Sequence, residues 1–146
     1  MTRTKDAAFR AGTAAHRALL RLSRGRAFGR VAGMPVIVLS TTGRRTGRTR
    51  STVLTAPVTD GGRLVLVASY GGDHRHPAWF LNVRANPDVT VTTGGRCTPM
   101  HARVATAAER ADLWPRVVAA YPGYATYQAR TPRTIPLVIV EPRHGG

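Results

Sequence analysis

The chain contains few cysteines, few acidic residues and no long apolar runs, and each shortage excludes a class of protein. Cys97 is the only cysteine among 146 residues, which excludes a disulfide framework, a cysteine-based zinc site and a CxxC redox pair and predicts a reducing compartment. The 7 acidic residues are scattered and no GxSxG motif occurs, which argues against a hydrolase. The longest apolar runs, such as Pro35–Leu39, are far shorter than the ~20 residues of a membrane-spanning helix.

Arginine is abundant by contrast. The chain has 22 Lys+Arg and a formal net charge of +15, and Lys5 is its one lysine. Hydrophobic residues make up 42%, alongside 15 Gly and 10 Pro, a composition typical of a turn-rich folded domain rather than a disordered basic tail. A chain of this length can form one domain whose core needs no metal or disulfide. The positive charge favours an anionic partner without identifying it.

Residues 1–30 are predicted to form a basic amphipathic helix, separate from a domain over residues 31–146. The segment carries eight basic side chains and one acid, with alanines and leucines at helical spacing. Two interpretations stay open: a solvated surface helix, or peripheral contact with an anionic membrane. Specific nucleic-acid binding is not expected, because no aromatic ladder or helix-turn-helix pattern accompanies the charge. The N-terminus lacks the apolar stretch of a secretory signal, so we expect a cytoplasmic protein, on the inner face of the cell membrane if the helix binds lipid.

From Pro35 onward the sequence changes to short β-branched runs separated by turn signals. Asp60-Gly61-Gly62 and Gly94-Gly95 predict tight hairpins. Strands are expected at residues 36–42, 50–59, 63–69, 89–93, 96–104 and 135–141, the first three in antiparallel order. About six strands linked mainly by hairpins predict a mainly β fold with flanking helices (α+β), a closed or nearly closed antiparallel barrel. A Rossmann fold is excluded because βαβ units and a GxGxxG motif are missing.

Proline and capping signals define the helices of this domain. Pro77 suits the first position of a helix that runs to about Ala85. Thr106 and Glu109 have capping-box spacing, so a second helix begins there. Pro115 is expected to kink that helix or restart it, because proline removes an N–H from the helical ladder.

The segment from Thr41 to Arg50 is the first candidate site. It reads TTGRRTGRTR, so two glycines bracket three polar residues and four arginines lie close together between two expected strands. Glycines free backbone N–H groups and guanidinium groups bind oxyanions in a planar fork, which suggests a cradle for phosphate or carboxylate. The spacing is not that of a Walker A loop. An ordinary basic hairpin explains the segment equally well.

Flat aromatic side chains form the second candidate site. Trp79 lies on the helix after Pro77, and Tyr121, Tyr124 and Tyr127 recur at three-residue spacing. A proline-glycine pair interrupts the tyrosine segment and predicts a loop or hinge that covers a pocket. Such side chains line a pocket for a flat ring or simply pack. A phosphate cradle, a flat-ring pocket and poor acid–base candidates together indicate an enzyme that borrows its reactive group from a cofactor.

A metal site is not expected. Asp73, His74, His76 and His101 lack the spacing of a known metal motif, and Arg75 separates two of the histidines.

Several motifs, in matching order over about residues 35–141, resemble the deazaflavin (F420)-dependent nitroreductase family. They are LSTTGRRTGRTR at residues 39–50, VASYGG at 67–72, HPAWFLN at 76–82, ANP at 85–87, AAYPGY at 119–124 and YQ at 127–128. Two departures stand out: Phe80 occupies a position where relatives often carry tyrosine, and arginines replace lysines common in the basic loop.

The resemblance implies an FMN-binding split-barrel-like fold that binds coenzyme F420. The reduced form, F420H2, would pass a hydride to a quinone, a nitro compound or another electrophile such as an enone. The residues implied to hold the cofactor's phosphate and acidic tail are Arg44, Arg45, Thr46, Gly47 and Arg50. The residues implied to border the ring or otherwise bind the cofactor are Pro57, Ala68, Ser69, Gly71, Pro77, Trp79 and Asn82. Tyr121, Tyr124 and Tyr127 would shape the acceptor side, with a proton from Ser69, a tyrosine or water.

Two other classes of function stay open from the sequence. The barrel could bind flavin mononucleotide, a tetrapyrrole-like molecule or a lipid, or the chain could be a basic module for membrane or nucleic acid without catalysis. The sequence leaves the physiological acceptor and the oligomeric state undetermined.

Overall fold

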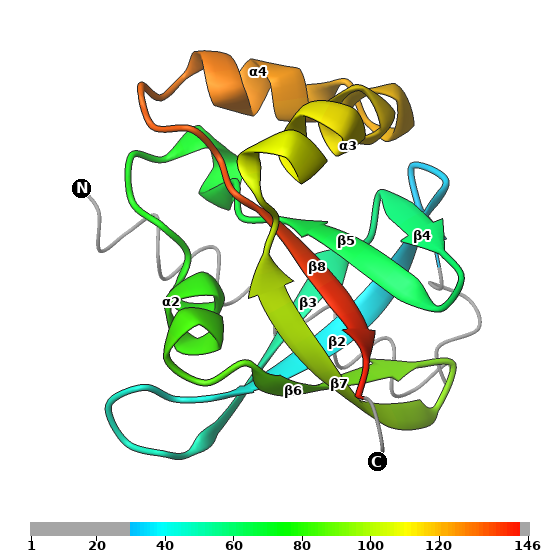
Figure 1. Cartoon of the computed structure of the whole chain (residues 1–146), viewed down its shortest axis with the longest axis vertical. Coiled ribbons are helices and arrows are strands. Elements are labelled where there is room, and N and C mark those ends of the chain that lie inside the picture. Colours follow the sequence, from blue (N-terminus) through cyan, green and yellow to red (C-terminus); the bar gives the residue numbers. More distant parts are fainter. Residues whose placement is uncertain (1–29, 144–146) are drawn as a thin grey trace.

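The computed structural model describes residues 30–143, so the helix expected over residues 1–30 lies outside the described residues apart from its last residue. The strands are β1 (Arg30–Val31), β2 (Met34–Thr42), β3 (Thr49–Thr55), β4 (Val58–Asp60), β5 (Arg63–Val67), β6 (Asp88–Thr93), β7 (Arg96–Val104) and β8 (Leu137–Pro142). The helices are the short 3-10 turn η1 (Tyr70–Gly72), α2 (Ala78–Ala85), α3 (Ala107–Ala120) and α4 (Gly123–Ala129). Figure 1 shows α3 and α4 together at one end of the sheet.

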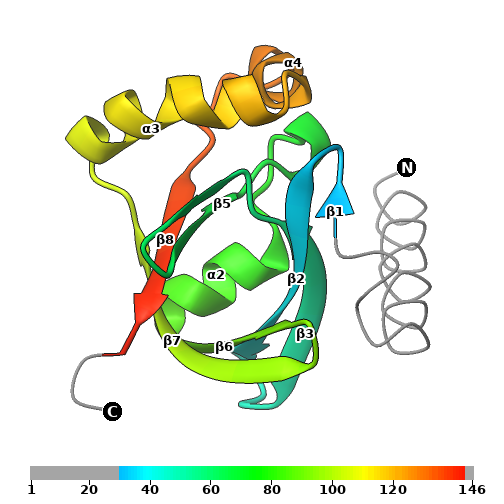
Figure 2. The ribbon, with the colours of Figure 1, turned by 90° about the vertical axis from the view of Figure 1, so that its right-hand side faces the viewer.

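The strands form one antiparallel sheet that curls into a split barrel. The pairing order is β1-β2-β6-β7-β8-β5-β4, and β3 pairs with the free side of β2. β3 pairs only with β2 and β4 only with β5, so both are edge strands although they follow each other in the chain. Figure 2 shows β2 and β3 on the side of the barrel opposite β8. The prediction of a mainly β barrel with flanking helices is confirmed.

One expected strand is divided in two. The prediction of a single strand over residues 50–59 is wrong, because the chain leaves β3 after Thr55 and enters β4 at Val58. Pro57 cannot donate to a sheet ladder, and the preceding N–H of Ala56 bonds to the carbonyl of Pro35. β4 then pairs with β5, whose other neighbour is β8. The expected antiparallel run of three neighbouring strands is therefore replaced by two separate hairpins.

The local turn and cap signals are confirmed. Gly61-Gly62 and Gly94-Gly95 join β4 to β5 and β6 to β7, with positive φ at all four glycines, as tight hairpins of this kind require. The capping box between Thr106 and Glu109 is formed in both directions. Pro77 lies one position earlier than expected, as the N-cap of α2.

Pro115 does not restart the second helix. α3 runs continuously from Ala107 to Ala120 with Pro115 inside it. Ala111, whose carbonyl lacks a partner at position 115, and Pro115 itself are both exposed, so water can solvate that carbonyl.

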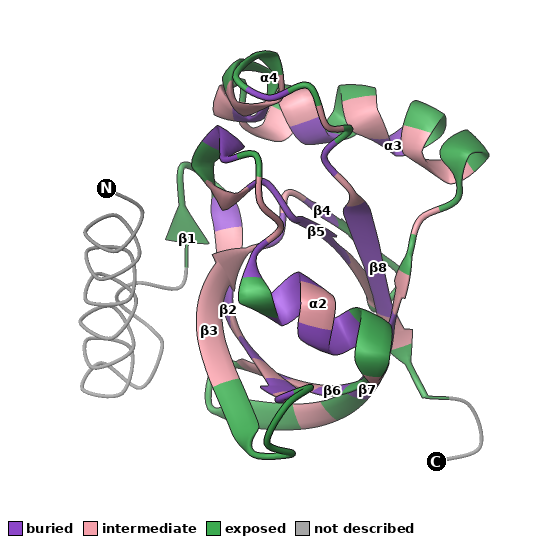
Figure 3. Ribbon diagram, turned by 90° about the vertical axis from the view of Figure 1, so that its left-hand side faces the viewer, coloured by how far each residue is buried: buried purple, intermediate pink, exposed green. Residues whose placement is uncertain are grey.

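Two hydrophobic clusters share the β5–β8 pair. Leu66, Val138 and Val140 point into the barrel, where α2 adds Phe80 and Val83. The alternate side chains of the same two strands pack beneath α3 and α4; they include Val65, Val67, Leu137 and Ile139. Figure 3 shows α2 lying across one open side of the barrel. The helices thus cover the barrel at two places.

Candidate active site

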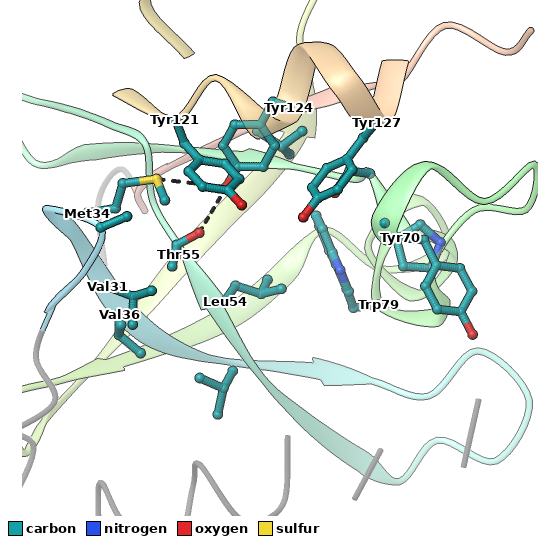
Figure 4. Close-up of a pocket in the computed structure, with 16 residues that line it drawn as sticks. Val31, Met34, Val36, Leu54, Thr55, Tyr70, Trp79, Tyr121, Tyr124 and Tyr127 are labelled. Carbon is teal, nitrogen blue, oxygen red and sulfur yellow. Dashed lines mark hydrogen bonds between the residues drawn. The ribbon is translucent and has the colours of Figure 1, made fainter. Parts of the chain in front are cut away.

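A cleft of about 370 Å³ opens where α4, η1 and the beginning of α2 meet strands β2 and β3 (Figure 4). The volume lies within the ~300–1,000 Å³ of ordinary small-molecule sites. Most lining side chains are aliphatic or aromatic, so the cleft favours a flat and largely apolar ligand. It therefore has the size and chemistry of a site for a ring system.

Seven residues expected at the site line this cleft. They are Ser69, Gly71, Pro77, Trp79, Tyr121, Tyr124 and Tyr127. Sequence reasoning missed the other lining residues, which are Val31, Ala32, Met34, Val36, Val53, Leu54, Thr55, Val67 and Tyr70. These are ordinary strand residues for the most part, and only the curl of the sheet brings them to the cleft. Tyr70 alone carried a signal, since it stands between Ser69 and two glycines.

The three tyrosines form one aromatic wall. Tyr121 follows α3 as its C-cap, while Tyr124 and Tyr127 lie on α4. Their ring centroids are 5.1 Å apart for Tyr121 and Tyr124 and 6.1 Å apart for Tyr124 and Tyr127. The rings meet edge to face, and Gly123 leaves room for this packing, because a Cβ there would lie 2.6 Å from Cζ of Tyr121. The predicted interruption at Pro122 and Gly123 is confirmed as the junction between two helices.

Tyr124 is bound to the barrel through its hydroxyl group. That hydroxyl lies 2.9 Å from Oγ1 of Thr55 and donates to Sδ of Met34 at 3.9 Å. The side chain is buried, and burial raises the pKa of the Tyr124 phenol. Tyr124 therefore stays protonated and fastens α4 to β2 and β3.

Tyr127 lies beside Tyr121, and their ring centroids are 6.4 Å apart. The neighbouring Tyr121 phenol, together with partial burial, raises the pKa of Tyr127. The guanidinium carbon of Arg130 lies 5.7 Å from the centre of the Tyr127 ring, and its positive charge acts to lower the pKa of Tyr127. Tyr127 therefore keeps its phenolic proton at the cleft wall at neutral pH.

The facing wall is a strained turn. Tyr70 has a φ of +47° and Gly71 and Gly72 continue in the left-handed region at +63° and +83°, which is unusual for a tyrosine. A Cβ on Gly72 would lie 2.8 Å from the carbonyl oxygen of Tyr127, so the turn and α4 touch. Ser69 precedes this turn and is buried at the cleft.

The basic loop lies outside this cleft and is internally organised. Asn82 of α2 accepts from the main-chain N–H of Arg44 at 3.2 Å and from its Nη1 at 3.1 Å, and donates to Thr41 at 3.1 Å. The N–H groups of Gly43, Gly47 and Arg48 are also bonded within the loop. The prediction that the glycines leave backbone N–H groups free for a ligand is therefore wrong at these three positions, because the N–H groups bond to acceptors within the loop.

The guanidinium groups of the loop keep their charge available. Among residues 30–143, no carboxylate lies within 4.0 Å of Arg44, Arg45, Arg48 or Arg50. All four side chains are exposed. Unpaired guanidinium groups at one end of a hairpin attract phosphate and carboxylate groups. α2 links the two parts of the site, with Trp79 at the cleft and Asn82 under the loop.

The remaining expected residues lie elsewhere. Ala68 is fully buried in the barrel core and Pro57 is half-buried at the β3–β4 junction, so neither lines the cleft. Nδ1 of His76 accepts a hydrogen bond from Nη1 of Arg133 at 3.3 Å, and burial lowers the pKa of His76. No three His, Cys, Asp or Glu side chains gather as a metal site within residues 30–143. Over the same residues, no helix has the length and apolarity to cross a bilayer.

The fold and the site define a split-barrel protein with an aromatic cleft beside an arginine-rich loop. A family model described as F420H(2)-dependent quinone reductase matches residues 13–142, and the chain belongs to this family. The F420H(2)-dependent quinone reductase Rv1261c of Mycobacterium tuberculosis is 38% identical over 132 residues, which are 88% of each chain. The resemblance seen in the sequence motifs is thereby confirmed.

Solved structures agree with this assignment. A structure described as F420-H2 dependent reductase (FDR-A) is 44% identical, with a TM-score of 0.67 over 73% of this chain and 94% of that chain. A second, described as a domain-swapped dimer, is 38% identical with a TM-score of 0.67 over 86% of this chain and 98% of that chain. Both likenesses cover nearly the whole of the other chain.

Proposed function

We propose that this chain is an F420H2-dependent reductase that passes a hydride to a quinone. The observation that carries the proposal is the family match over residues 13–142 combined with an aromatic cleft and with guanidinium groups that have no acidic partner among residues 30–143. F420H2, when bound, supplies the hydride. The protein supplies orientation, exclusion of water and charge.

The residues present fit a cofactor with a flat ring and an anionic tail. Apolar and aromatic walls suit the ring, and the exposed arginines suit phosphate and carboxylate groups. In our proposal Arg44, Arg45 and Arg50, with Thr46 and Gly47, hold the tail, and Asn82 fixes the loop against α2. Ser69, Gly71, Pro77 and Trp79 border the ring. Pro57 and Ala68 contribute only through the framework behind the cleft.

The tyrosines divide into two roles in this proposal. Tyr127 holds a phenolic proton at the cleft wall, and Tyr121, Tyr127 and Ser69 are the candidates to deliver a proton to the reduced acceptor. Tyr124 positions α4, since its hydroxyl is already bonded to Thr55 and Met34. Nitroaromatic compounds and enones are proposed as further acceptors, because they too are flat and accept hydride.

The deciding experiment measures turnover and cofactor affinity together. Purified protein is mixed with F420H2 and a naphthoquinone, and cofactor oxidation is followed optically. We expect turnover that requires protein, cofactor and quinone, and none with reduced FMN in place of F420H2. Retention of FMN with no F420H2 oxidation would replace the proposal by the flavin-binding alternative.

A charge reversal in the loop tests the site of the tail. A charge-assisted hydrogen bond contributes ~1.5–3 kcal/mol, so Arg45→Glu should raise the cofactor Kd by more than about tenfold. Arg96→Glu, at an exposed position of the β6–β7 hairpin, changes the net charge equally and is the matched control. Equal affinities of the two variants would remove Arg45 from the site.

Peripheral membrane contact through residues 1–30 stays a separate proposal. Its support is the eight basic side chains and single acid of that segment and the lipid solubility of many quinones. Sedimentation of the full chain with anionic vesicles, compared with a variant carrying Arg17→Glu and Arg21→Glu, tests it. Equal sedimentation of both chains would exclude it.

A further inference from the structure

Arg133 lies behind the cleft, in the segment between α4 and β8, and reaches across to the facing wall. Its Nε donates to the carbonyl of Asp73 at 2.9 Å, and its Nη2 donates to the carbonyls of Ala68 and Ser69 at 3.1 and 2.9 Å. Nη1 lies 3.3 Å from Nδ1 of His76. One planar guanidinium group thus contacts four positions between residues 68 and 76, which span the strained turn of the cleft.

The other end of this arginine is fixed to the helices. Gln128 of α4 donates to the carbonyl of Arg133 at 2.7 Å and accepts from the N–H of Ile135 at 2.9 Å. Arg110 of α3 donates to the same Gln128 oxygen at 3.1 Å and to the carbonyl of Ile135 at 3.0 Å. The backbone of Arg133 is therefore tied to the helices that carry the tyrosine wall, while its side chain holds the opposite wall.

The two walls also touch directly, and this contact leaves no room for a side chain at Gly72. Gly72 packs so closely on α4 that a Cβ would lie 2.8 Å from the Tyr127 carbonyl and 3.0 Å from Cβ of Arg130. Nη1 of Arg130 approaches the carbonyl of Gly71 at 3.4 Å. A small rotation about this contact would change the gap between Ser69 and the tyrosines, and the Arg133 fork opposes such a rotation.

We infer that Arg133 is a positioning residue of the cleft, which sets the distance and angle between the Ser69–Gly72 turn and the tyrosine wall. The inference rests on the proposed function for its effect on turnover. A lysine could not replace it, because an ammonium group is a point donor on a flexible stem, whereas the guanidinium fork serves several acceptors at fixed angles. Burial lowers the pKa of Arg133 while the nearby Asp73 carboxylate acts in the opposite direction.

The first test needs no cofactor. The amides of Gly72 and Asp73 bond to the carbonyls of Ser69 and Tyr70 within the turn, so hydrogen exchange there reports its rigidity. Arg133→Lys should speed exchange at these amides by about tenfold or more, with exchange in the β6–β7 hairpin unchanged. Unchanged exchange at the turn would overturn the inference.

The second test uses turnover, with Arg103→Ala as the matched control. Arg103 bonds to Glu109 and Glu141 far from the cleft, so its loss lowers stability without touching either wall. We expect Arg133→Lys and Arg133→Ala to lower kcat by about tenfold or more, while Arg103→Ala keeps the kcat of the folded wild type. Added ethylguanidinium should restore part of kcat to Arg133→Ala and none to any other variant.

The outcomes separate the two proposals. Wild-type kcat in Arg133→Lys, or a loss in both Arg133 variants that only follows the fraction of folded protein, overturns the positioning role. If Arg133→Ala does not fold, Arg133→Lys decides the question. Wild-type protein that never oxidises F420H2 overturns the proposed function instead, while faster exchange at the turn in Arg133→Lys would still support the role of Arg133 in holding the cleft walls.

Discussion

Replacing Tyr124 by phenylalanine tests the division of roles among the three tyrosines. The change removes one hydroxyl group that bonds to Thr55 at 2.9 Å and donates to Met34 at 3.9 Å, and leaves the buried ring in place. The first contact is an ordinary neutral hydrogen bond worth ~0.5–1.5 kcal/mol net, and the long contact to sulfur adds little. We therefore expect Tyr124→Phe to lower the free energy of unfolding by about 1 kcal/mol.

Urea denaturation measures this loss. With an m value of ~1–3 kcal/mol/M, a loss of this size lowers the midpoint by about 0.3–1 M. A double-mutant cycle with Thr55→Val isolates the contact, and we expect a coupling energy of about 1 kcal/mol. Tyr127→Phe is the matched control, since it removes a phenol of the same cleft wall without removing the Thr55 and Met34 contacts of Tyr124.

For turnover we expect Tyr127→Phe to have the larger effect of the two variants. Tyr124→Phe is expected to keep most of the wild-type kcat, while Tyr127→Phe lowers it more, because only the latter removes a proton held at the cleft wall. A Tyr124→Phe variant with unchanged stability and a collapsed kcat would refute the reasoning, since the hydroxyl would then act on the acceptor.

Two further predictions concern a glycine and a carboxylate. In Gly123→Ala the new Cβ collides with the ring of Tyr121, which must turn aside. The gain of ~0.4–1 kcal/mol from a less flexible unfolded chain offsets part of the lost ring packing, so Tm should change by less than about 3 °C. The KM for quinone should rise, and an unchanged KM would contradict the assigned position of that ring. The Arg103 guanidinium and the cap at Thr106 hold the pKa of Glu109 at about 2, against 4.5 for the free side chain. A depressed pKa stabilises the fold above pH 4.5 and less as pH falls toward 2, so Glu109→Gln should lower Tm at neutral pH and the difference from wild type should close between these values. A difference in Tm that stays constant down to pH 2 would contradict the ion pair.

Much of the barrel could be predicted because its signals are local. Paired glycines with positive φ at residues 61–62 and 94–95 fix two hairpins, and the Thr106 cap fixes the beginning of α3. These features depend on a few neighbouring residues, so the sequence alone specifies them. The division at Ala56 and Pro57 was not predicted, because it depends on which distant strand each half pairs with.

The candidate site likewise combines residues that the sequence alone reveals with residues that only the fold brings together. Tyrosines at three-residue spacing and an arginine cluster are visible in the sequence because their chemistry is unusual. Val53 and Leu54 reach the cleft only through the curl of the sheet, and nothing in the sequence marks them. Arg133 resembled any other arginine of a basic chain until its four contacts were seen. The left-handed backbone of Tyr70 is likewise imposed by the packing of Gly72 on α4.

The strands β5 and β8 have no solvent-facing surface of their own in their middle portions, since alternate side chains enter the barrel and the layer beneath α3 and α4. The helical layer therefore cannot separate from the barrel without wetting Val65, Val67 and Ile139. Helices that frame a binding site often open and close as a lid, but here such an excursion would approach the cost of global unfolding. Ligand entry and exit should instead proceed past the β3 edge and the turn at Tyr70. The tyrosine-bearing helices should stay in place and form a fixed wall of the cleft.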